Sequence, residues 1–195
     1  MYNDTHKLLD LLVAFRAVER MVTVRGDSRL ENDAEHSFSL TLLAWMLSRS
    51  FAELDQNRVI RYALVHDLVE AYAGDTYIWD PHSVATKKER ETNAENRIDE
   101  EFREAFPDLP KTIRAYEARK DEESKFVWVL DKLIAPLMIL HSGRGFWKEH
   151  GVTLAQLKRN KEARLAVFPG LTPLYTALTA ELSAAEHDLF APPHD

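Results

Sequence analysis

Three observations predict an all-α protein. The chain of 195 residues contains only six glycines and eight prolines, so long segments run without a helix breaker. Apolar residues in those segments recur with a spacing near 3.6, which is typical of amphipathic helices. Alternating β-branched residues, the usual sign of a half-buried strand, are nearly absent. We therefore expect one domain over residues 1–195 with about 7–8 helices, since a chain of this length can bury one sizeable core.

Polar or glycine-containing loops delimit the first four predicted helices. The first carries a leucine-rich apolar stripe, and the third begins at Asp55, whose side chain is a good N-cap. Gly74 stops the third helix, and a loop over residues 74–83 follows. The charge run of the fourth helix indicates a solvated face. The four helices are expected to end near Met21, Ala52, Ala73 and Phe106.

Proline and glycine also punctuate the C-terminal half. Pro107 and Pro110 precede a short helix, and a long helix follows from Asp121 to Leu140, with a kink expected at Pro136. Beyond it we expect a stop at Gly143 and Gly145, amphipathic helices over 153–165 and 171–187, and a disordered tail over 191–195.

The C-terminal helices carry more leucine than the rest of the pattern requires. Residues 8–140 contain the candidate functional residues, whereas the helices over 151–188 contribute a further apolar stripe. An amphipathic stripe must be covered by something. We expect these helices either to cover the core or to form the seam of a dimer.

Composition excludes several classes of function. The net charge is −7 and the sequence pI is about 5.6, which argues against a broad surface for nucleic-acid polymers. No cysteine is present, so thiolate metal sites and disulfides are excluded. An apolar stretch of about 18 residues is absent, so we expect no membrane span, and without a leader segment we expect a cytoplasmic protein. A small anionic substrate is compatible if positive charge is local.

A His-Asp pair interrupts an apolar helix. His66 and Asp67 stand within residues 62–71, where unpaired burial of ionisable groups costs several kcal/mol. His36 and Asp131 also lie in apolar helical stretches. Two imidazoles and two carboxylates suit a divalent transition ion, so these four side chains are the candidate metal ligands. The alternative is a buried salt-bridge cluster with a structural role.

Neighbouring polar residues are interpreted from helical spacing. Glu70 lies one turn after His66 and shares a face with it. Lys132 follows Asp131 directly and is expected to point to another face of that helix. A second His-Asp pair, His187-Asp188, lacks comparable partners and is interpreted as an exposed helix end.

The order His36, His66-Asp67 and Asp131 resembles the HD superfamily of metal-dependent phosphohydrolases, over roughly residues 8–140. Within it, the chain is most similar to the YfbR-like 5′-deoxynucleotidases. The residues that carry this similarity are Glu35-His36, His66-Asp67-x-x-Glu70-x-x-x-Gly74-Asp75, and Lys125-Phe126-Val127 ahead of Leu130-Asp131.

The resemblance implies an all-α HD-domain bundle and assigns roles to several residues. His36, His66, Asp67 and Asp131 would bind the metal, and Glu70 and Asp75 would be the acid and base that handle the attacking water and the leaving group. Superfamily members with two metals interpose additional histidines before the last aspartate. Here that interval contains only His82, interpreted as a surface residue, so one ion is expected.

Substrate recognition requires positive charge at an acidic site. Arg20 and Arg29 flank the loop that leads to His36, and arginine binds phosphate in a bidentate manner. The similar subgroup has an Arg-Trp pair at the end of the first helix, whereas this chain has Arg20-Met21. Trp79, after Asp75, is a candidate replacement for the missing aromatic surface.

These observations predict a metal-dependent phosphomonoesterase that converts (deoxy)nucleoside 5′-monophosphates to nucleoside and phosphate. The ion would be manganese, cobalt, iron, nickel or zinc. Two alternatives stay open: hydrolysis of another phosphate bond, in a cyclic nucleotide, a nucleoside triphosphate or guanosine tetraphosphate, and a non-catalytic metal-binding helical sensor. A homodimer is expected because members of the subgroup often dimerise.

Overall fold

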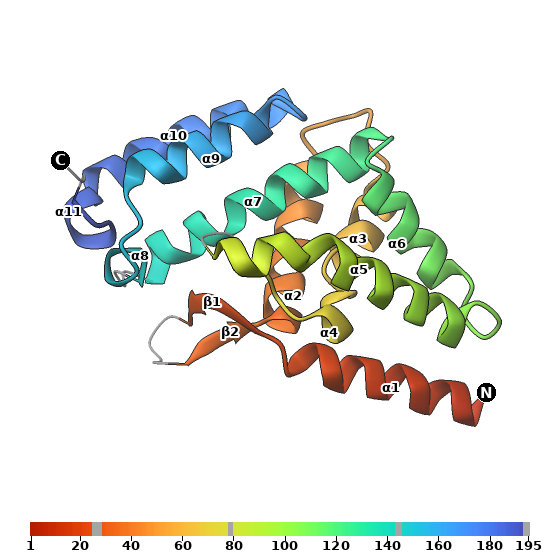
Figure 1. The fold of residues 1–195 in the computed structure, drawn as a ribbon. Coiled ribbons are helices and arrows are strands. Elements are labelled where there is room, and N and C mark those ends of the chain that lie inside the picture. The colour runs from red at the N-terminus through yellow and green to blue at the C-terminus, as the bar shows by residue number, and fades with distance from the viewer. Residues whose placement is uncertain (25–28, 78–79, 143–145, 193–195) are drawn as a thin grey trace. The chain divides into compact units, whose positions relative to one another are not determined.

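The computed structural model is helical apart from one two-stranded sheet, as Figure 1 shows, which confirms the all-α prediction. The sheet pairs β1 (Glu19–Thr23) with β2 (Leu30–Asn32). No helix in the described part of the chain is both long enough and apolar enough to cross a membrane. The structure describes residues 1–24, 29–77, 80–142 and 146–192.

The chain divides into two units. The first consists of residues 1–21 and 31–124, and the second of residues 22–30 and 125–195.

Helices α1 to α6 belong to the first unit. Within it, α2 packs against α3 and α1, α4 against α1 and α5, and α6 against α3 and α5. Leu11 and Phe15 of α1 are buried in one apolar cluster with Ile98 of α5 and Ile113 of α6. The helices are α1 (Tyr2–Arg16), α2 (Asp33–Ser48), α3 (Gln56–Val65), α4 (Glu70–Ala73), α5 (Pro81–Phe102) and α6 (Asp108–Ala118).

Side-chain caps start two of these helices. The Asp55 carboxylate accepts hydrogen bonds from the backbone N–H groups of Asn57 and Arg58 at 2.9 and 3.3 Å, so the predicted N-cap of α3 is confirmed. At α2, Asn32 and Glu35 form a reciprocal capping box. This box begins α2 with His36 in its first turn.

The first predicted helix is too long. It ends at Arg16, and the residues up to Met21 lie in a turn and in β1. The backbone N–H of Asp33 donates to the Val18 carbonyl at 3.1 Å, which brings the segment after α1 next to the start of α2. A long-range contact therefore overrides the local helical pattern. Strand β1 carries Arg20, which is central to the site described below.

The second unit contains α8 to α11 and all of α7 after its first residues. Phe126 of α7 contacts Phe168 edge to face, with ring centroids 5.3 Å apart. The elements are α7 (Glu122–Ser142), α8 (Phe146–Glu149), α9 (Leu154–Leu165), a 3-10 turn (Pro169–Leu171), α10 (Thr172–Ala184) and α11 (Glu186–Leu189).

Two expectations about the C-terminal half need correction. Pro110 does not precede the short helix but lies within the first turn of α6, where a missing N–H is tolerated. The tail is not disordered from residue 191, because Ala191 is buried and its N–H donates to the Val152 carbonyl at 3.0 Å. Gly143, Gly145 and residues 193–195 lie outside the described residues.

Candidate metal centre

His66 and Asp67 lie in a turn between α3 and α4, and not inside one continuous helix as the sequence pattern predicts. Backbone hydrogen bonds there join residues three apart instead of four. The N–H of Leu68 donates to Val65 O at 3.1 Å, and the N–H of Glu70 donates to Asp67 O at 2.8 Å. The break lets consecutive side chains of the pair reach the same place. In a continuous helix, residues one position apart point about 100° from each other.

Three predicted ligands come together in the first unit. The Asp67 carboxylate oxygen Oδ2 lies 2.9 Å from His66 Nε2 and 3.8 Å from His36 Nε2. The two imidazole rings are 5.2 Å apart between centroids, and both are almost completely buried. One atom from each of the three residues lies within 4.8 Å of the others. Two imidazole nitrogens and a carboxylate at this spacing fit a divalent transition ion.

Neighbouring groups orient both imidazoles. The Nδ1 of His66 is 2.9 Å from the carbonyl oxygen of Ala63, so Nδ1 carries the proton and Nε2 faces Asp67. Tyr116 of α6 contacts the His66 ring edge to face. The Nδ1 of His36 lies 3.6 Å from the buried carboxylate of Glu31. Such contacts on the far nitrogen fix the ring that holds a metal.

Arg20 links the pair to two further carboxylates. Its Nη1 donates to Asp33 at 3.0 Å and to Asp67 at 2.7 Å, and it lies 3.9 Å from Glu70 Oε2. Asp33 is completely buried, and a buried carboxylate needs a partner of opposite charge. Arg20, for which phosphate binding was predicted, is thus the cation that pairs with these carboxylates.

The acidic groups beside Arg20 hold protons more tightly than in water. Burial raises the pKa of Asp33 to about 6, against the opposing effect of the Arg20 guanidinium. Burial also raises the pKa of Glu70 well above its usual range, and the carboxylates of Asp67 and Asp33 add to this rise. A raised pKa makes the carboxyl of Glu70 easier to protonate than an exposed glutamate, as is common for the acid-base residues of active sites.

The predicted acid-base residues lie at the two ends of α4. Glu70 is the first residue of this short helix and is buried, and Asp75 follows the Gly74 that ends it. Asp75 lies in an irregular segment and is partly exposed. Helical spacing predicts only that Glu70 lies near His66, and the role of Asp75 is what the family resemblance implies.

Asp131 is described within the second unit. It lies on α7, is 4% exposed, and its Oδ2 accepts a bond from Lys132 Nζ at 2.5 Å. The prediction that Lys132 points to another face is therefore wrong, because its long flexible stem folds back onto the preceding residue. Lys161 of α9 is also buried, and this burial lowers its pKa to about 7.

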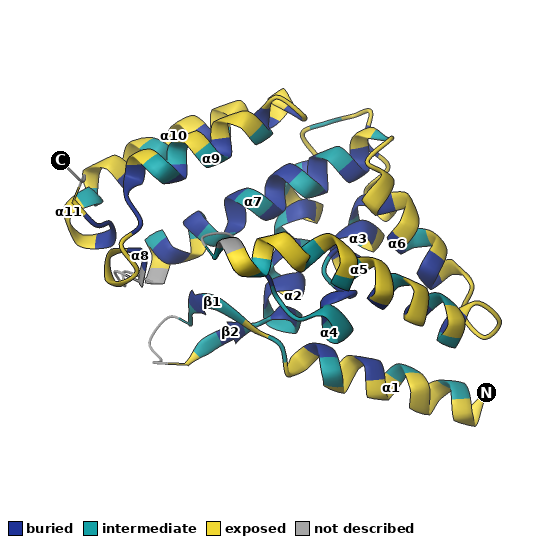
Figure 2. Cartoon of the chain, viewed as in Figure 1, coloured by how far each residue is buried: buried dark blue, intermediate teal, exposed yellow. Residues whose placement is uncertain are grey.

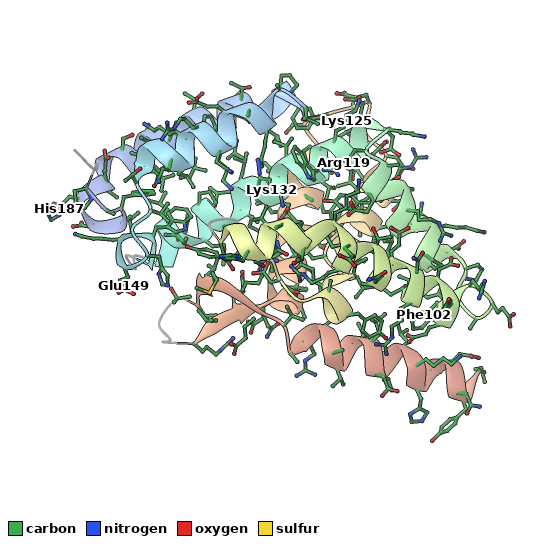
Figure 3. All side chains as sticks on the ribbon, in the orientation of Figure 1. Phe102, Arg119, Lys125, Lys132, Glu149 and His187 are labelled. Atoms are coloured by element: carbon green, nitrogen blue, oxygen red, sulfur yellow. The ribbon has the colours of Figure 1, made fainter. Side chains whose placement is uncertain are left out.

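The other predicted residues differ in how they are placed. Arg29 is exposed between the two strands, and its Nη1 donates to the Leu30 carbonyl at 3.2 Å. Trp79 lies outside the described residues. His82 is exposed at the start of α5, as expected of a surface residue. His187, labelled in Figure 3, lies on α11, and its side chain is 95% exposed.

Sequence reasoning missed Asp33 and Lys87. Asp33 lies directly after Asn32 and two residues before Glu35, a spacing that fits a capping box. The Nζ of Lys87 lies 3.8 Å from Glu70 Oε1 and 2.7 Å from Glu91. It belongs to the charge run that was interpreted as a solvated face, and no local signal distinguishes it from its neighbours.

Comparisons with known proteins agree with a helical fold that groups His36, His66 and Asp67. A family described as HD domain matches residues 14–171. A mouse (Mus musculus) protein named 5′-deoxynucleotidase HDDC2 is 33% identical over 109 residues, which cover 55% of this chain and 54% of the mouse protein, so the match spans about half of that relative. The human (Homo sapiens) 5′-deoxynucleotidase HDDC2 is 28% identical over 171 residues, covering 87% of this chain and 81% of the human one.

Solved structures show the same fold. A predicted metal-dependent phosphohydrolase from Magnetospirillum magnetotacticum is 30% identical, with a TM-score of 0.81 and coverage of 98% of this chain and 96% of the other. The PH0347 protein from Pyrococcus horikoshii has a TM-score of 0.59 at 22% identity, with coverage of 91% and 99%, and supports the fold alone.

Proposed function

Because the chain belongs to the HD domain family of metal-dependent phosphohydrolases, we propose that it hydrolyses (deoxy)nucleoside 5′-monophosphates to nucleoside and inorganic phosphate. The observation that carries the proposal is the grouping of His36, His66 and Asp67 beside the buried Glu70. Similar proteins that support the proposal are the mouse and human proteins named 5′-deoxynucleotidase HDDC2 and the predicted metal-dependent phosphohydrolase from Magnetospirillum magnetotacticum.

We propose that these three residues bind one divalent ion, with Asp131 as the fourth ligand. Asp131 is a buried carboxylate at the position that the HD pattern assigns to the last ligand. Manganese, cobalt, iron, nickel and zinc all accept imidazole and carboxylate ligands. When bound, such an ion lowers the pKa of a coordinated water to about 7 and polarises a phosphoryl oxygen.

The remaining residues supply proton transfer and phosphate binding. Glu70, with its raised pKa, accepts the proton of the attacking water. Asp75 donates a proton to the departing 5′ oxygen of the sugar. Arg20, which forms an ion pair with Asp67, binds a phosphate oxygen. Arg29 contributes a second guanidinium to the phosphate. The result is in-line attack of water on phosphorus with the nucleoside as leaving group.

Phosphate release from a nucleotide panel tests this proposal. Chelated protein, reloaded separately with manganese, cobalt, zinc or magnesium, is incubated with ribo- and deoxyribonucleoside mono- and triphosphates and with cyclic nucleotides. Metal-dependent release from monophosphates is expected. Activity confined to triphosphates or cyclic nucleotides would show that the substrate is not a monophosphate. No phosphate release from any nucleotide, with metal bound, would favour the non-catalytic sensor.

We also propose a cytoplasmic homodimer, with the seam in the first unit. The leucines that raised the possibility of a C-terminal seam, among them Leu157, Leu178 and Leu182, are already buried in the single chain. In contrast, α1 and α2 expose large apolar side chains, and Figure 2 shows most of α1 in the yellow of exposed residues. These are Leu9, Leu12, Val13, Phe38, Leu42, Trp45 and Met46.

A further inference from the structure

Arg90 of α5 binds the segment that carries Asp75. Its Nη1 donates to the carbonyl oxygens of Ala73 and Gly74, the latter at 3.3 Å. Its Nη2 donates to the Thr76 hydroxyl at 2.8 Å and to the Ser83 carbonyl at 3.3 Å. One guanidinium therefore joins the end of α4, the irregular segment that follows, and the start of α5.

These contacts enclose Asp75 on both sides. Gly74 has a φ of +74°, a conformation that glycine adopts at little cost, and it turns the chain out of α4. Thr76 is buried although its segment is irregular. The residue between them has its backbone held through both neighbours, so the direction of its side chain depends on Arg90.

Arginine is suited to this task and lysine is not. The planar guanidinium presents five N–H donors in a fixed fork, and here they reach acceptors on three separate stretches of chain. Its Nε completes the set by donating to the Thr86 hydroxyl at 3.3 Å, one turn earlier on α5. An ammonium group on a flexible stem cannot meet the same acceptors together.

We propose that Arg90 is a positioning residue, which holds the segment over residues 73–76 so that the Asp75 carboxyl is presented to the leaving group. This inference rests on the proposed role of Asp75 as a general acid. Arg90 itself touches neither the metal ligands nor, in this proposal, the substrate. Its loss should affect protonation of the leaving group more than binding of the metal or the phosphate.

The test compares substrates whose leaving groups differ in basicity. A nucleoside 5′-monophosphate releases a basic alkoxide that needs a proton, whereas p-nitrophenyl phosphate releases a phenolate that does not. In Arg90→Ala, kcat on the nucleotide should fall roughly 10- to 100-fold, in line with the cost of a displaced catalytic group, with KM nearly unchanged. Activity on p-nitrophenyl phosphate should fall by no more than about threefold, because proton donation contributes little there.

Two further variants make the result specific. Arg90→Lys should resemble Arg90→Ala. The double variant Arg90→Ala/Asp75→Asn should be no slower than Asp75→Asn alone, since both changes remove the same function. The matched control is Arg97→Ala. Arg97 also lies on α5 and stacks on Tyr72 of α4 at 3.6 Å from the ring centroid, without touching the 73–76 segment, so its loss should not discriminate between the substrates.

Equal losses on both substrates, additive effects in the double variant, or loss of metal would overturn the proposal. A second readout is independent of activity. Amide hydrogen exchange in Arg90→Ala should increase over residues 73–77 and stay unchanged in α3. An inactive wild type would remove the nucleotidase proposal, while unchanged exchange over this segment would remove the role of Arg90.

Discussion

At the scale of single residues, context separates two identical dipeptides. His66 is buried and Asp67 is half-buried beside His36, whereas His187-Asp188 is exposed at a helix end. We expect His66→Ala and Asp67→Ala each to abolish metal binding and turnover, because each removes one of the few donors of the site. Elemental analysis of the purified variants and phosphate release measure the two effects.

The chain supplies its own control for this prediction. His187→Ala removes the histidine of the exposed pair and should leave both the metal content and the rate at wild-type levels. Full turnover in His66→Ala would contradict the assignment of the centre.

Glu70 should be separable from the ligands by a conservative change. Glu70→Gln keeps the size of a buried side chain but removes its ability to exchange a proton. We expect metal content to persist while kcat falls on the order of 10²- to 10⁴-fold, the usual contribution of a general acid or base. Glu89→Gln, an exposed substitution on α5, is the comparison variant. Metal loss in Glu70→Gln would instead make position 70 a ligand.

The grouping of His36, His66 and Asp67 was predictable because ionisable residues inside apolar stretches need partners. The ion pairs of Arg20 could not be predicted from the sequence. Its partners, Asp33 and Asp67, are 13 and 47 residues away, and nothing local distinguishes this arginine from a surface one. Lys132 shows the opposite failure, since helical geometry places its Cα correctly but does not determine the path of a four-carbon stem.

At the scale of elements, the N-cap of α3 was predicted and the helix breaks were not. Asp55 begins α3 because its side chain binds two N–H groups of the first turn, a purely local interaction. The turn over residues 66–69 and the early end of α1 depend on contacts with distant segments, among them the bond from Asp33 to Val18. Periodicity continues across both positions, so pattern alone predicts unbroken helices.

Helix α9 contains a pH-sensitive lysine. Lys161 is 6% exposed, and burial lowers its pKa to about 7 from 10.5 in the unfolded chain. Between these values the unfolded state binds more protons than the folded state. The free energy of unfolding should therefore rise with pH from about 7 to 10.5, by at most about 1.4 kcal/mol per pH unit.

Lys161→Met should remove this dependence, and below pH 7 it should be more stable than the wild type because no ammonium is buried. Urea unfolding of both proteins at several pH values gives the difference. Lys158→Met serves as the control on the same helix, since Lys158 is exposed and bonds Ser183 at 3.0 Å. Parallel pH profiles for the wild type and Lys161→Met would contradict the prediction.

At the scale of the whole molecule, sequence periodicity shows that a stripe is apolar but not whether the same chain covers it. The leucines of α9 and α10 and the apolar residues of α1 and α2 give similar patterns, yet the former are buried and many of the latter are exposed. Coverage depends on the rest of the fold. The sequence therefore left open whether the C-terminal helices cover the core or form a dimer seam, and the structure buries their leucines within the chain.

An exposed apolar face of this extent on α1 and α2 should be covered by a second copy of the chain. Trp45 is 50% exposed and Phe38 is 64% exposed. Large contiguous patches of exposed apolar side chains are rare on monomeric proteins and mark sites of interaction. A charge placed there would be buried unpaired in a two-fold interface. Light scattering coupled to size exclusion should accordingly give a dimeric mass for the wild type and a monomeric mass for Trp45→Glu. Val167→Glu, at an exposed apolar position of the second unit, should remain dimeric, and a monomeric wild type at high concentration would sink the proposal.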